Sequence, residues 1–497
     1  MQVSAIVVDT RKLVPQCIFV AIRGAKADGH QFLAEAVAKG AIVLVVEDAA
    51  NVPAGFRGFV QKVPSSRLEL ARLASVWASL PSQNLFTVGV TGTNGKTTTT
   101  HMIESVLNAG SIPTGVIGTI DHHFGSKVWP TELTTPDPMA FQMRLKEFVK
   151  LGAKAVALEV SSHALMQSRV DFVEFNAGVF SNLTRDHLDY HGTMENYFEA
   201  KVRFFSELLT NSKKKETFAI LNGDDDWVLK ARDRLLKRKR STIWTFANAA
   251  TPASKKLGKI EFTFEIVEQS FEGVRFKLKT PGGTHSILLP MTGLHNVQNA
   301  VSAFAVGLAA GIDERQLVKS LGEIPGVNCR LESVRNSKGV HVFVDFAHTD
   351  EGLVATLKTL TAIRESAAAS GRASATAKII TVFGCGGDRD RGKRPLMMRA
   401  ALDGSDKVVV TSDNPRNEDP EVILDDAMAA VKSEEKAKVQ RIADRRKAIE
   451  RAIEAAAPGD VVLIAGKGHE TTQQIGAVKH PFSDARVARE ILEGEHA

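Results

Sequence analysis

The chain contains few cysteines, no long apolar run and no long tail of a single charge. Its 497 residues include three Cys, at positions 17, 329 and 385, and none are spaced as CxxC. This pattern predicts neither a zinc ribbon nor a disulfide framework. No apolar stretch approaches the roughly 18 residues of a membrane span, and Asp9 and Arg11 come before a signal-peptide core can form. We therefore expect a cytoplasmic protein that is neither exported nor membrane-spanning.

Net charge says little about the binding partner. The formal net charge is +6 and the sequence pI is about 9.0, but Lys and Arg are spread along the whole chain. Their densest segment, residues 230–240, also carries Leu235 and Leu236, which favours a solvated helix face over a nucleic-acid site. Small anionic substrates explain the positive balance equally well. We expect no nucleic-acid partner.

The order of apolar segments predicts an α/β protein of about three domains. We expect a small N-terminal α/β domain (1–82), a central P-loop ATPase-like domain with a parallel sheet (83–324) and a C-terminal Rossmann-like doubly wound domain (325–497). Strand and helix are expected to alternate through the central domain as far as Leu321. The predicted strands cover residues 5–8, 18–22, 42–46, 85–91, 154–160, 177–180, 340–346, 378–383, 407–411 and 461–464.

A glycine-rich loop lies between the predicted strand 85–91 and a predicted helix at 97–108. Glycines in such a loop let backbone N–H groups point at phosphate oxygens, and the helix N-terminus adds its positive dipole end. The lysine supplies a charge and the threonine hydroxyl after it can ligate Mg²⁺. The spacing departs from GxxxxGK[ST], because Val90 stands six residues before the lysine. The context still predicts an ATP site made of Gly92, Thr93, Asn94, Gly95, Lys96, Thr97 and Thr98.

Carboxylate and imidazole groups follow two further predicted strands. Glu159 ends the strand 154–160 and is a candidate Mg²⁺ ligand, although a glutamate that caps the next helix is an equal alternative. His187 or Asp189 can ligate metal, yet histidines in such loops are more often hydrogen-bond partners. Thr193 is predicted to cap a helix that carries Lys201. On composition alone Lys201 is a surface lysine.

Six motifs then occur in one order along nearly the whole chain: TGTNGKTT at 91–98, EVSSH at 159–163, NLTRDHLDYHG at 182–192, YFEAK at 197–201, GLHNVQN at 293–299 and DFAHT at 345–349. Each is weak alone, but together they are specific. In these motifs the chain resembles the Mur ligase family, which builds the peptidoglycan stem peptide in the bacterial cytoplasm. The resemblance implies that ATP phosphorylates a substrate carboxylate, after which an amine attacks the acyl phosphate to give an amide, ADP and phosphate.

The resemblance also implies roles for individual residues. Catalytic and metal-binding roles fall to Lys96, Thr97, Glu159, His187 and Lys201, with Lys201 carbamylated so that it can ligate a second Mg²⁺. ATP contacts fall to Asn296, Asn299, Arg330 and Asp345, although the two asparagines are also explained as capping residues at a helix start. The chain departs from the family's pattern at three positions: Cys329 replaces the usual Gly, Phe346 the usual Tyr and Asp350 the usual Pro.

Other matching positions indicate the substrates. The members that bind UDP-N-acetylmuramoyl-L-alanyl-D-glutamate (the UDP-MurNAc-dipeptide) share the pattern found here at Val8, Thr10, Thr134, Thr135, Ser161, Gln167 and Arg169. The segment DNPR resembles the members that add meso-diaminopimelate, whose extra carboxylate suits the two parallel donors of an arginine. That pocket is expected to comprise Arg389, Asp413, Asn414, Pro415, Arg416, Gly466 and Glu470. Arg389 lies in the charged stretch DRDRGKR, where a solvated arginine is the ordinary expectation.

Three alternatives stay open at this point. An L-lysine-adding ligase of the same family lacks the arginine of DNPR, and a folylpolyglutamate synthetase lacks both DNPR and the Thr134-Thr135-Pro136 segment. A non-catalytic scaffold does not need Lys96 or Lys201, both of which are present. We expect a monomer with ATP, Mg²⁺ and a carbamylated lysine as cofactors.

Overall fold

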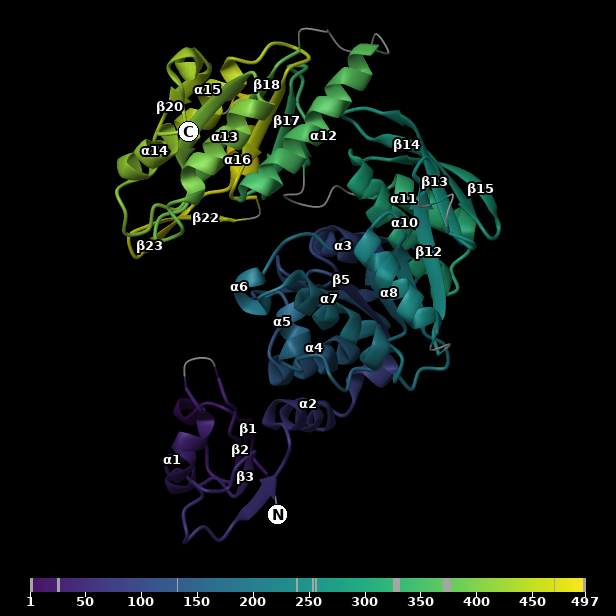
Figure 1. Cartoon of the computed structure of the whole chain (residues 1–497), viewed down its shortest axis with the longest axis vertical. Helices are drawn as coiled ribbons and strands as arrows, with labels where there is room; N and C mark the ends of the chain where they lie inside the picture. The colour runs from purple at the N-terminus through teal and green to yellow at the C-terminus, as the bar shows by residue number, and fades with distance from the viewer. Residues whose placement is uncertain are drawn as a thin grey trace. The chain divides into compact units, whose positions relative to one another are not determined.

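The computed structural model describes residues 3–24, 27–131, 133–237, 240–252, 254, 257–324, 331–369, 377–468 and 470–494. The chain forms two compact units, which are described separately below. Figure 1 labels the helices and strands. The first comprises residues 1–264, 279–283 and 298–320, and the second comprises residues 265–278, 284–297 and 321–497.

The N-terminal segment of the first unit is a four-stranded parallel sheet with the order β1-β2-β3-β4. Phe19, Leu44 and Val46 are buried on one face, whereas Val20 and Val45 are buried on the other. Burial on both faces explains why the strands are continuous apolar runs. The elements are β1 (Ile6–Val7), β2 (Ile18–Val20), α1 (Leu33–Ala38), β3 (Val43–Val46), β4 (Phe59–Lys62) and α2 (Ser66–Trp77).

An eleven-stranded sheet follows, with the order β15-β14-β13-β12-β11-β10-β5-β9-β6-β7-β8. From β12 to β6 neighbouring strands are parallel, whereas β6, β7 and β8 pair antiparallel. The strands are β5 (Phe86–Thr91), β6 (Thr114–Ile117), β7 (His122–Phe124), β8 (Lys127–Trp129), β9 (Ala155–Glu159), β10 (Ala177–Phe180), β11 (Phe218–Asn222), β12 (Thr242–Asn248), β13 (Phe262–Gln269), β14 (Val274–Thr280) and β15 (Gly283–Leu289).

The expected alternation of strand and helix as far as Leu321 is wrong for β6, β7 and β8, which follow one another without a helix, and again for residues 262–289. Here β13, β14 and β15 follow one another without a helix between them. In β14 Val274, Phe276 and Leu278 are buried while the residues between them are exposed. That period of two is typical of a strand with one solvated face, which needs no covering helix.

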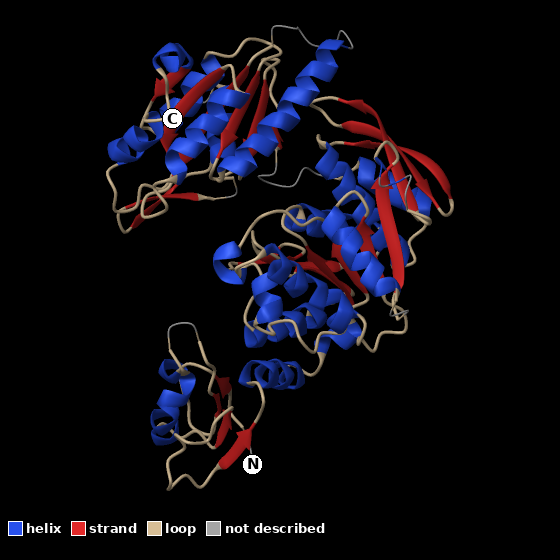
Figure 2. Ribbon diagram, in the orientation of Figure 1, coloured by secondary structure: helices blue, strands red, loops and turns tan. Residues whose placement is uncertain are grey.

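Helices cover the parallel part of this sheet (Figure 2). One core joins Phe141 and Phe148 of α4, Phe198 of α7 and Leu235 of α8 to the sheet. Residues 230–237 form the expected solvated face of α8, because Lys230 and Arg234 are exposed while Leu235 is buried. The helices are α3 (Lys96–Ala109), α4 (Pro138–Lys150), α5 (Ser162–Met166), α6 (Leu188–His191), α7 (Met194–Arg203), which continues as a π-helix (Phe204–Leu209), α8 (Asp226–Leu236), α10 (Leu294–Ala309) and α11 (Glu314–Gly322).

The second unit contains a doubly wound sheet with the order β16-β17-β21-β18-β19-β20. Leu463 of β21 packs with α12, α13 and α14, whereas Val462 and Ile464 pack with α15 and α16. Successive residues therefore serve the two faces, which confirms the predicted Rossmann-like arrangement. Its elements are β16 (Glu332–Val334), β17 (His341–Asp345), α12 (Asp350–Ala369), β18 (Ile379–Cys385), α13 (Lys393–Gly404), β19 (Lys407–Ser412), α14 (Pro420–Met428), β20 (Val439–Arg441), α15 (Arg445–Glu454), β21 (Val461–Ala465), β22 (Thr472–Ile475), β23 (Val478–Pro481) and α16 (Asp484–Glu493).

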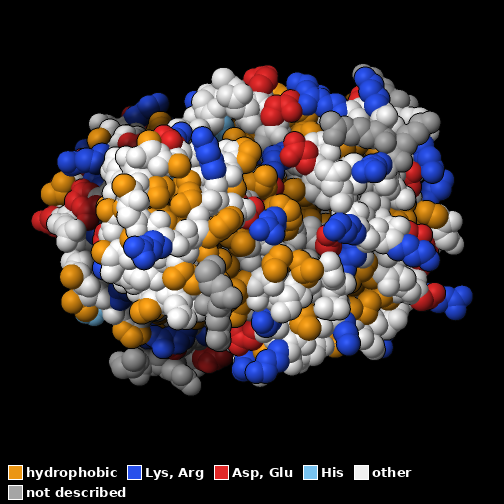
Figure 3. Space-filling view, turned by 90° about the horizontal axis from the view of Figure 1, so that it is seen from below, with side chains coloured by type: hydrophobic (Ala, Val, Ile, Leu, Met, Phe, Trp, Pro, Cys, Tyr) orange, Lys and Arg blue, Asp and Glu red, His pale blue; other side chains and the backbone are white. Residues whose placement is uncertain are grey.

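The surface offers no single-sign region on the face that Figure 3 shows, where basic and acidic side chains are interspersed among apolar ones. Among the described helices, none combines the length and the apolar character that a membrane crossing requires.

Candidate active site

Four parallel strands of the first unit end side by side at one edge of the sheet. Thr91 of β5 pairs with Phe180 of β10, and Val90 pairs with Glu159 of β9. On the far side of β9, Ile117 of β6 pairs with Leu158. The segments that follow these strands are therefore neighbours, at the sheet edge where doubly wound proteins bind ligands.

The glycine loop has the backbone that phosphate binding requires. Gly92 has a φ of 146° and a Cβ there would lie 2.0 Å from Ser181 Oγ, while Gly95 has a φ of 84° directly before α3. The Lys96 ammonium lies over the loop and donates to the carbonyls of Gly92 (3.0 Å) and Thr93 (2.8 Å). Thr97 and Thr98 are buried in the first turn of the helix. The loop thus brings backbone N–H donors, the N-terminus of α3 and the Lys96 ammonium close together, as a phosphate site requires.

The segment after β10 holds this loop in place, a role that the sequence interpretation missed. The Asn182 side chain accepts from Asn94 N (2.9 Å) and donates to Asn94 O (3.1 Å). Ser181 Oγ donates to the same carbonyl (2.6 Å), and the Asn182 carbonyl accepts from Thr93 N (3.0 Å). The signal was present, because NLTRD follows a buried strand next to the loop strand.

Glu159 is fully buried and does not cap the next helix, so that alternative is wrong. Ser161 caps α5 instead, accepting from Ala164 N. Glu159 Oε1 accepts from Thr97 Oγ1 (2.9 Å) and Thr119 N (2.8 Å), and Oε2 accepts from Thr119 Oγ1 (3.0 Å). A Cβ on Gly118 would lie 2.5 Å from Oε1, so only glycine leaves room for the carboxylate.

These groups fit a Mg²⁺ ion. Hard cations take oxygen ligands, and the Thr97 hydroxyl and the Glu159 carboxylate are in direct contact. Within the described chain no Lys or Arg forms an ion pair with Glu159. A buried carboxylate without such a partner is stabilised by a bound cation.

Lys201 is buried, with 1% of its surface exposed, so the surface alternative is wrong. It sits one turn after Tyr197 on α7, which Thr193 caps as predicted. Its Nζ donates to Gly92 O (2.8 Å) and lies 4.8 Å from the centre of the Tyr197 ring. Burial, reinforced by the nearby charge of Lys96, holds the pKa of Lys201 well below its ordinary value. The amine next to the phosphate loop is therefore biased toward its neutral form.

His187 lies in a group of aromatic rings close to this lysine helix. Its ring centre is 5.0 Å from that of His163 and 6.0 Å from that of Tyr197, and its Nε2 is 3.3 Å from Asp186 Oδ2. The His187 side chain is 44% exposed; desolvation of its covered part, together with the charge of Lys96, lowers its pKa despite Asp186. A neutral imidazole is the form that ligates a metal. Asp189, the other candidate, is exposed as well.

The predicted dipeptide-binding residues are brought together beside Glu159. Thr134 accepts from Thr119 Oγ1 (3.1 Å), and Thr135 Oγ1 donates to the Glu159 carbonyl (2.7 Å) and contacts Ser161 Oγ (3.3 Å). Arg169 donates to the Thr135 carbonyl (2.7 Å) and to Gln167 Oε1 (2.7 Å). In the N-terminal sheet, Val8 is exposed and Thr10 begins a short 3-10 helix.

The predicted nucleotide-side residues occupy different surroundings. Asn299 accepts from Thr99 Oγ1 (3.0 Å) and lies close enough to Gly95 that a Cβ there would be 2.7 Å from its oxygen. Asn296 is buried and donates to Thr292 O (2.8 Å). In the second unit, Asp345 accepts from Leu331 N and Ala347 N. Arg330 lies outside the described residues.

The second unit holds a buried polar cluster where β19 and β21 end. Lys467 Nζ contacts Asn414 Oδ1 (3.1 Å), Glu470 Oε2 (2.8 Å) and, at 3.4 Å, Asp413 Oδ1. The Asn414 amide donates to the same Glu470 oxygen (2.7 Å). Burial raises the pKa of Asp413 despite the neighbouring cations. Lys467 was not predicted, although it stands inside the GKGHE segment that contributes Gly466 and Glu470.

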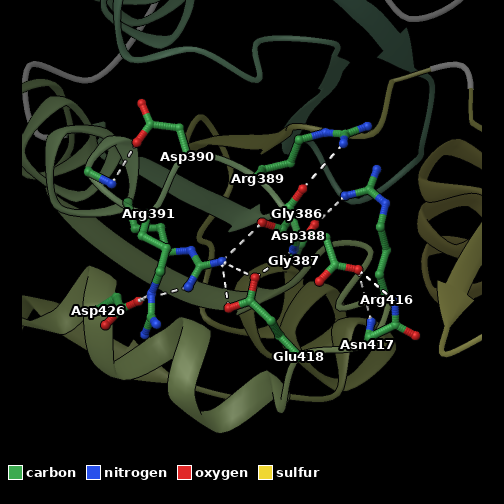
Figure 4. A network of polar contacts seen from close by, with 12 residues as sticks. Gly386, Gly387, Asp388, Arg389, Asp390, Arg391, Arg416, Asn417, Glu418 and Asp426 are labelled. Carbon is green, nitrogen blue, oxygen red and sulfur yellow. Dashed lines mark hydrogen bonds and ion pairs between the residues drawn. The ribbon is translucent and has the colours of Figure 1, made fainter.

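Arg416 and Arg389 both lie against Gly386 (Figure 4): a Cβ there would be 3.0 Å from Arg416 Nη1 and 3.7 Å from Arg389 Cγ. Arg416 follows Pro415 and has a φ of 52°. Its backbone N–H donates to Gln474 O, and its carbonyl accepts from Gly476 N. Its guanidinium donates to Gly387 O (2.5 Å). Arg389 is exposed, as the solvated alternative expects. In the described chain neither guanidinium forms an ion pair with a carboxylate, which suits an anionic ligand.

A fully buried ion pair between Arg445 and Asp484 stabilises the strand ends that carry this pocket. Arg445 donates two hydrogen bonds of 2.7 Å to Asp484, and two more to the carbonyls of Ser412 (3.2 Å) and Ala465 (3.0 Å). Ser412 and Ala465 are the last residues of β19 and β21. The guanidinium thus fixes the two strand ends from which the pocket residues emerge.

We expect Arg445→Leu to lower the free energy of unfolding by about 3–5 kcal/mol, because it leaves Asp484 buried without a partner. Urea unfolding followed by circular dichroism measures the change. Arg446→Leu is the matched control, since its partner Glu490 is partly exposed, and its expected cost is below about 1 kcal/mol. Equal losses in the two variants would contradict the structural role of Arg445.

Comparisons with known proteins can now be set beside this geometry. Residues 2–80 match the Mur ligase family, catalytic domain, residues 90–307 the Mur ligase middle domain, and residues 329–468 the Mur ligase, glutamate ligase domain. Proteins named UDP-N-acetylmuramoyl-L-alanyl-D-glutamate--2,6-diaminopimelate ligase are similar to this chain over nearly its whole length. The one from Geobacter metallireducens is 39% identical over 97% of this chain and 93% of its own length. The one from Geobacillus thermodenitrificans is 41% identical over 98% and 94%. A solved structure of a ligase of that name is 33% identical, covers 100% of this chain and 96% of its own, and has a TM-score of 0.71.

Proposed function

Because this chain belongs to the Mur ligase family, we propose that it is an ATP-dependent ligase of peptidoglycan precursor synthesis. It joins meso-diaminopimelate to UDP-N-acetylmuramoyl-L-alanyl-D-glutamate. The relatives that match over nearly its whole length carry the name of that activity. The observation that carries the proposal is the placement of Arg416 beside the polar cluster of Asp413, Asn414, Lys467 and Glu470.

The reaction begins with ATP at the glycine loop. The Gly92–Thr98 segment binds the phosphates, and Lys96 turns from the loop carbonyls to the transferring phosphoryl group. A carboxylate oxygen of the D-glutamyl residue attacks the γ-phosphorus, the bond to the β-phosphate oxygen breaks, and ADP leaves. Asn296, Asn299, Arg330 and Asp345 are proposed as further contacts to the nucleotide.

Thr97 and Glu159 would hold one Mg²⁺, and His187 with the carbamate of Lys201 would hold a second. Bound there, these ions would neutralise the negative charge on the transferring phosphoryl group. The chain itself orients the carboxylate of Glu159 through Thr119 and Thr97. Tyr197 and the Gly92 carbonyl fix the position of Lys201.

Amide formation completes the reaction. The neutral amine of meso-diaminopimelate attacks the acyl carbon, the bond to phosphate breaks, and the amine loses a proton. Arg416, with Arg389, binds the distal carboxylate through parallel charge-assisted hydrogen bonds, and Glu470 binds the distal ammonium. Arg169, Gln167, Thr134, Thr135 and Ser161 bind the dipeptide end of the nucleotide substrate, and Val8 and Thr10 its uridine end.

Residues 1–82, 83–324 and 325–497 are proposed as the UDP-substrate, ATP and amino-acid domains of a cytoplasmic monomer. An L-lysine-adding enzyme is disfavoured because lysine leaves the Arg416 guanidinium without its anion. A folylpolyglutamate synthetase is disfavoured by DNPR, and a non-catalytic scaffold by the buried Lys201 and Glu159.

Purified protein is expected to release phosphate from ATP at a substantial rate only when the UDP-dipeptide and meso-diaminopimelate are both present. L-Lysine at the same concentration is the matched control, and it is expected to support less than about one hundredth of that rate, since it lacks the charge-assisted pair. Equal turnover with L-lysine would exclude the proposed specificity. Phosphate release with a folate and glutamate would point to the other ligase class.

A further inference from the structure

A second group of metal-ligating side chains lies on α3, beyond the residues used above. His101 and Glu104 are three positions apart on one face of the helix, and His123 faces them from β7. His123 Nε2 is 3.0 Å from both Glu104 oxygens, and His101 Nδ1 is 3.8 Å from Glu104 Oε2. In the described part of the chain, these three form the group whose ligand atoms all lie within 4.8 Å of one another.

A fourth residue orients this group. Asp121 Oδ1 is 2.6 Å from Nδ1 of His123, so a proton held on Nδ1 leaves Nε2, which faces Glu104, available to a metal ion. A carboxylate behind a histidine is the usual means by which proteins fix the tautomer and orientation of a metal-binding imidazole. The histidine rings are stacked with centres 5.3 Å apart. The His101 and His123 imidazoles are therefore positioned to bind the same metal ion.

The chemistry of the group selects the kind of metal. Two imidazole nitrogens and one carboxylate suit Zn²⁺ and similar divalent ions, which take nitrogen at about 2.0–2.1 Å. Mg²⁺ prefers a shell of oxygens, so the Thr97 and Glu159 groups and this group differ in preference. The three side chains are 23%, 17% and 13% exposed, which leaves a path for an ion and a place for a water ligand.

We propose that His101, Glu104 and His123 form a site for a divalent transition metal such as Zn²⁺, with Asp121 as a positioning residue. The bound ion links the helix that starts at the phosphate loop to the β7 strand. It therefore stabilises the first unit against thermal unfolding, since a ligand that binds only the folded state raises its stability. Without the ion, Nδ1 of His123 lies next to Asp121 and Nε2 lies next to Glu104.

The test uses the full chain, stripped with a chelator and kept free of nucleotide and Mg²⁺. Titration with Zn²⁺ is expected to show one bound ion per chain and a rise in Tm, and Co²⁺ is expected to give visible absorption bands of a low-coordinate site. His123→Ala should lose the bound ion, the Tm rise and the bands. His480→Ala, an exposed histidine of β23, is the matched control and should keep all three.

If His123→Ala does not fold, two further variants still test the proposed metal site. Glu104→Gln preserves the side-chain volume and should abolish stoichiometric binding. Asp121→Asn should weaken it by about 10–100-fold, as expected for a residue behind a ligand. Absence of binding in the unaltered chain, or one bound Zn²⁺ that persists in His123→Ala and Glu104→Gln, would overturn the proposal.

Discussion

Replacing Lys201 with alanine is expected to lower kcat by about 10²–10³-fold while the KM values change little. This is the order of effect seen when a group that stabilises transition-state charge is removed. Lys201 is buried beside the phosphate loop, with its Nζ 2.8 Å from Gly92 O. A positive amine at that point would repel Lys96, whereas a carbamate would add a ligand for a cation.

The lowered pKa of Lys201 suits the carbamylation that we propose for it. In the proposed modification the neutral amine would attack CO₂, a C–N bond would form and one proton would leave, which would give the carbamate anion. Burial and the charge of Lys96 favour the neutral amine. Between its lowered pKa and the ordinary value near 10.5 the folded state binds fewer protons than the unfolded state, so this residue makes stability rise with pH in that window.

Three measurements distinguish a carbamate from a merely structural lysine. Depletion of CO₂ at neutral pH should lower activity, and bicarbonate should restore it. A small carboxylate such as formate should partly rescue Lys201→Ala, which leaves space, but not Lys201→Met, which fills it. Lys230→Ala, an exposed lysine on α8, is the control and should behave like the unaltered enzyme. A fully active Lys201→Ala variant would remove the carbamate from the mechanism.

The elements around the phosphate loop could be predicted because their signals are local. Apolar strands such as β5 and β10 are short and continuous, and Gly92 and Gly95 mark the turn between strand and helix. Thr193 was recognisable as a cap from the helix that follows it. Such patterns depend on neighbours in the chain, so one sequence is enough to find them.

Contacts between distant segments could not be predicted in the same way. Lys201 reads as a surface residue because nothing near it in the chain shows that α7 buries that face. The contact of Glu159 with Thr119 depends on which strands become neighbours, and that of Arg445 with Asp484 on the packing of α15 against α16. His101 and His123 are similar, since their spacing is not one of the familiar metal motifs and only the fold brings them together.

Arg416 provides the second large effect, which concerns the choice of amino acid. Arg416→Ala is expected to raise the KM for meso-diaminopimelate by about 100-fold and to leave the KM for ATP within about twofold. Losing a charge-assisted hydrogen bond costs about 1.5–3 kcal/mol, and each 1.4 kcal/mol is a factor of ten. L-Lysine has no distal carboxylate for Arg416 to bind, so its KM should hardly change in the variant. The preference for diaminopimelate over L-lysine should therefore fall by about the same 100-fold factor.

Two control variants separate charge from geometry in this pocket. Arg416→Lys keeps the charge but not the two parallel donors, and should recover only part of the affinity for diaminopimelate. Arg391→Ala removes an exposed arginine of the same charged stretch that pairs with Asp426, and should leave the preference unchanged. The backbone of Arg416 is fastened to the β22–β23 hairpin through Gln474 and Gly476. A selective ATP defect in Arg416→Ala would therefore mean that the side chain acts elsewhere, whereas a defect confined to diaminopimelate ties the guanidinium to the distal carboxylate.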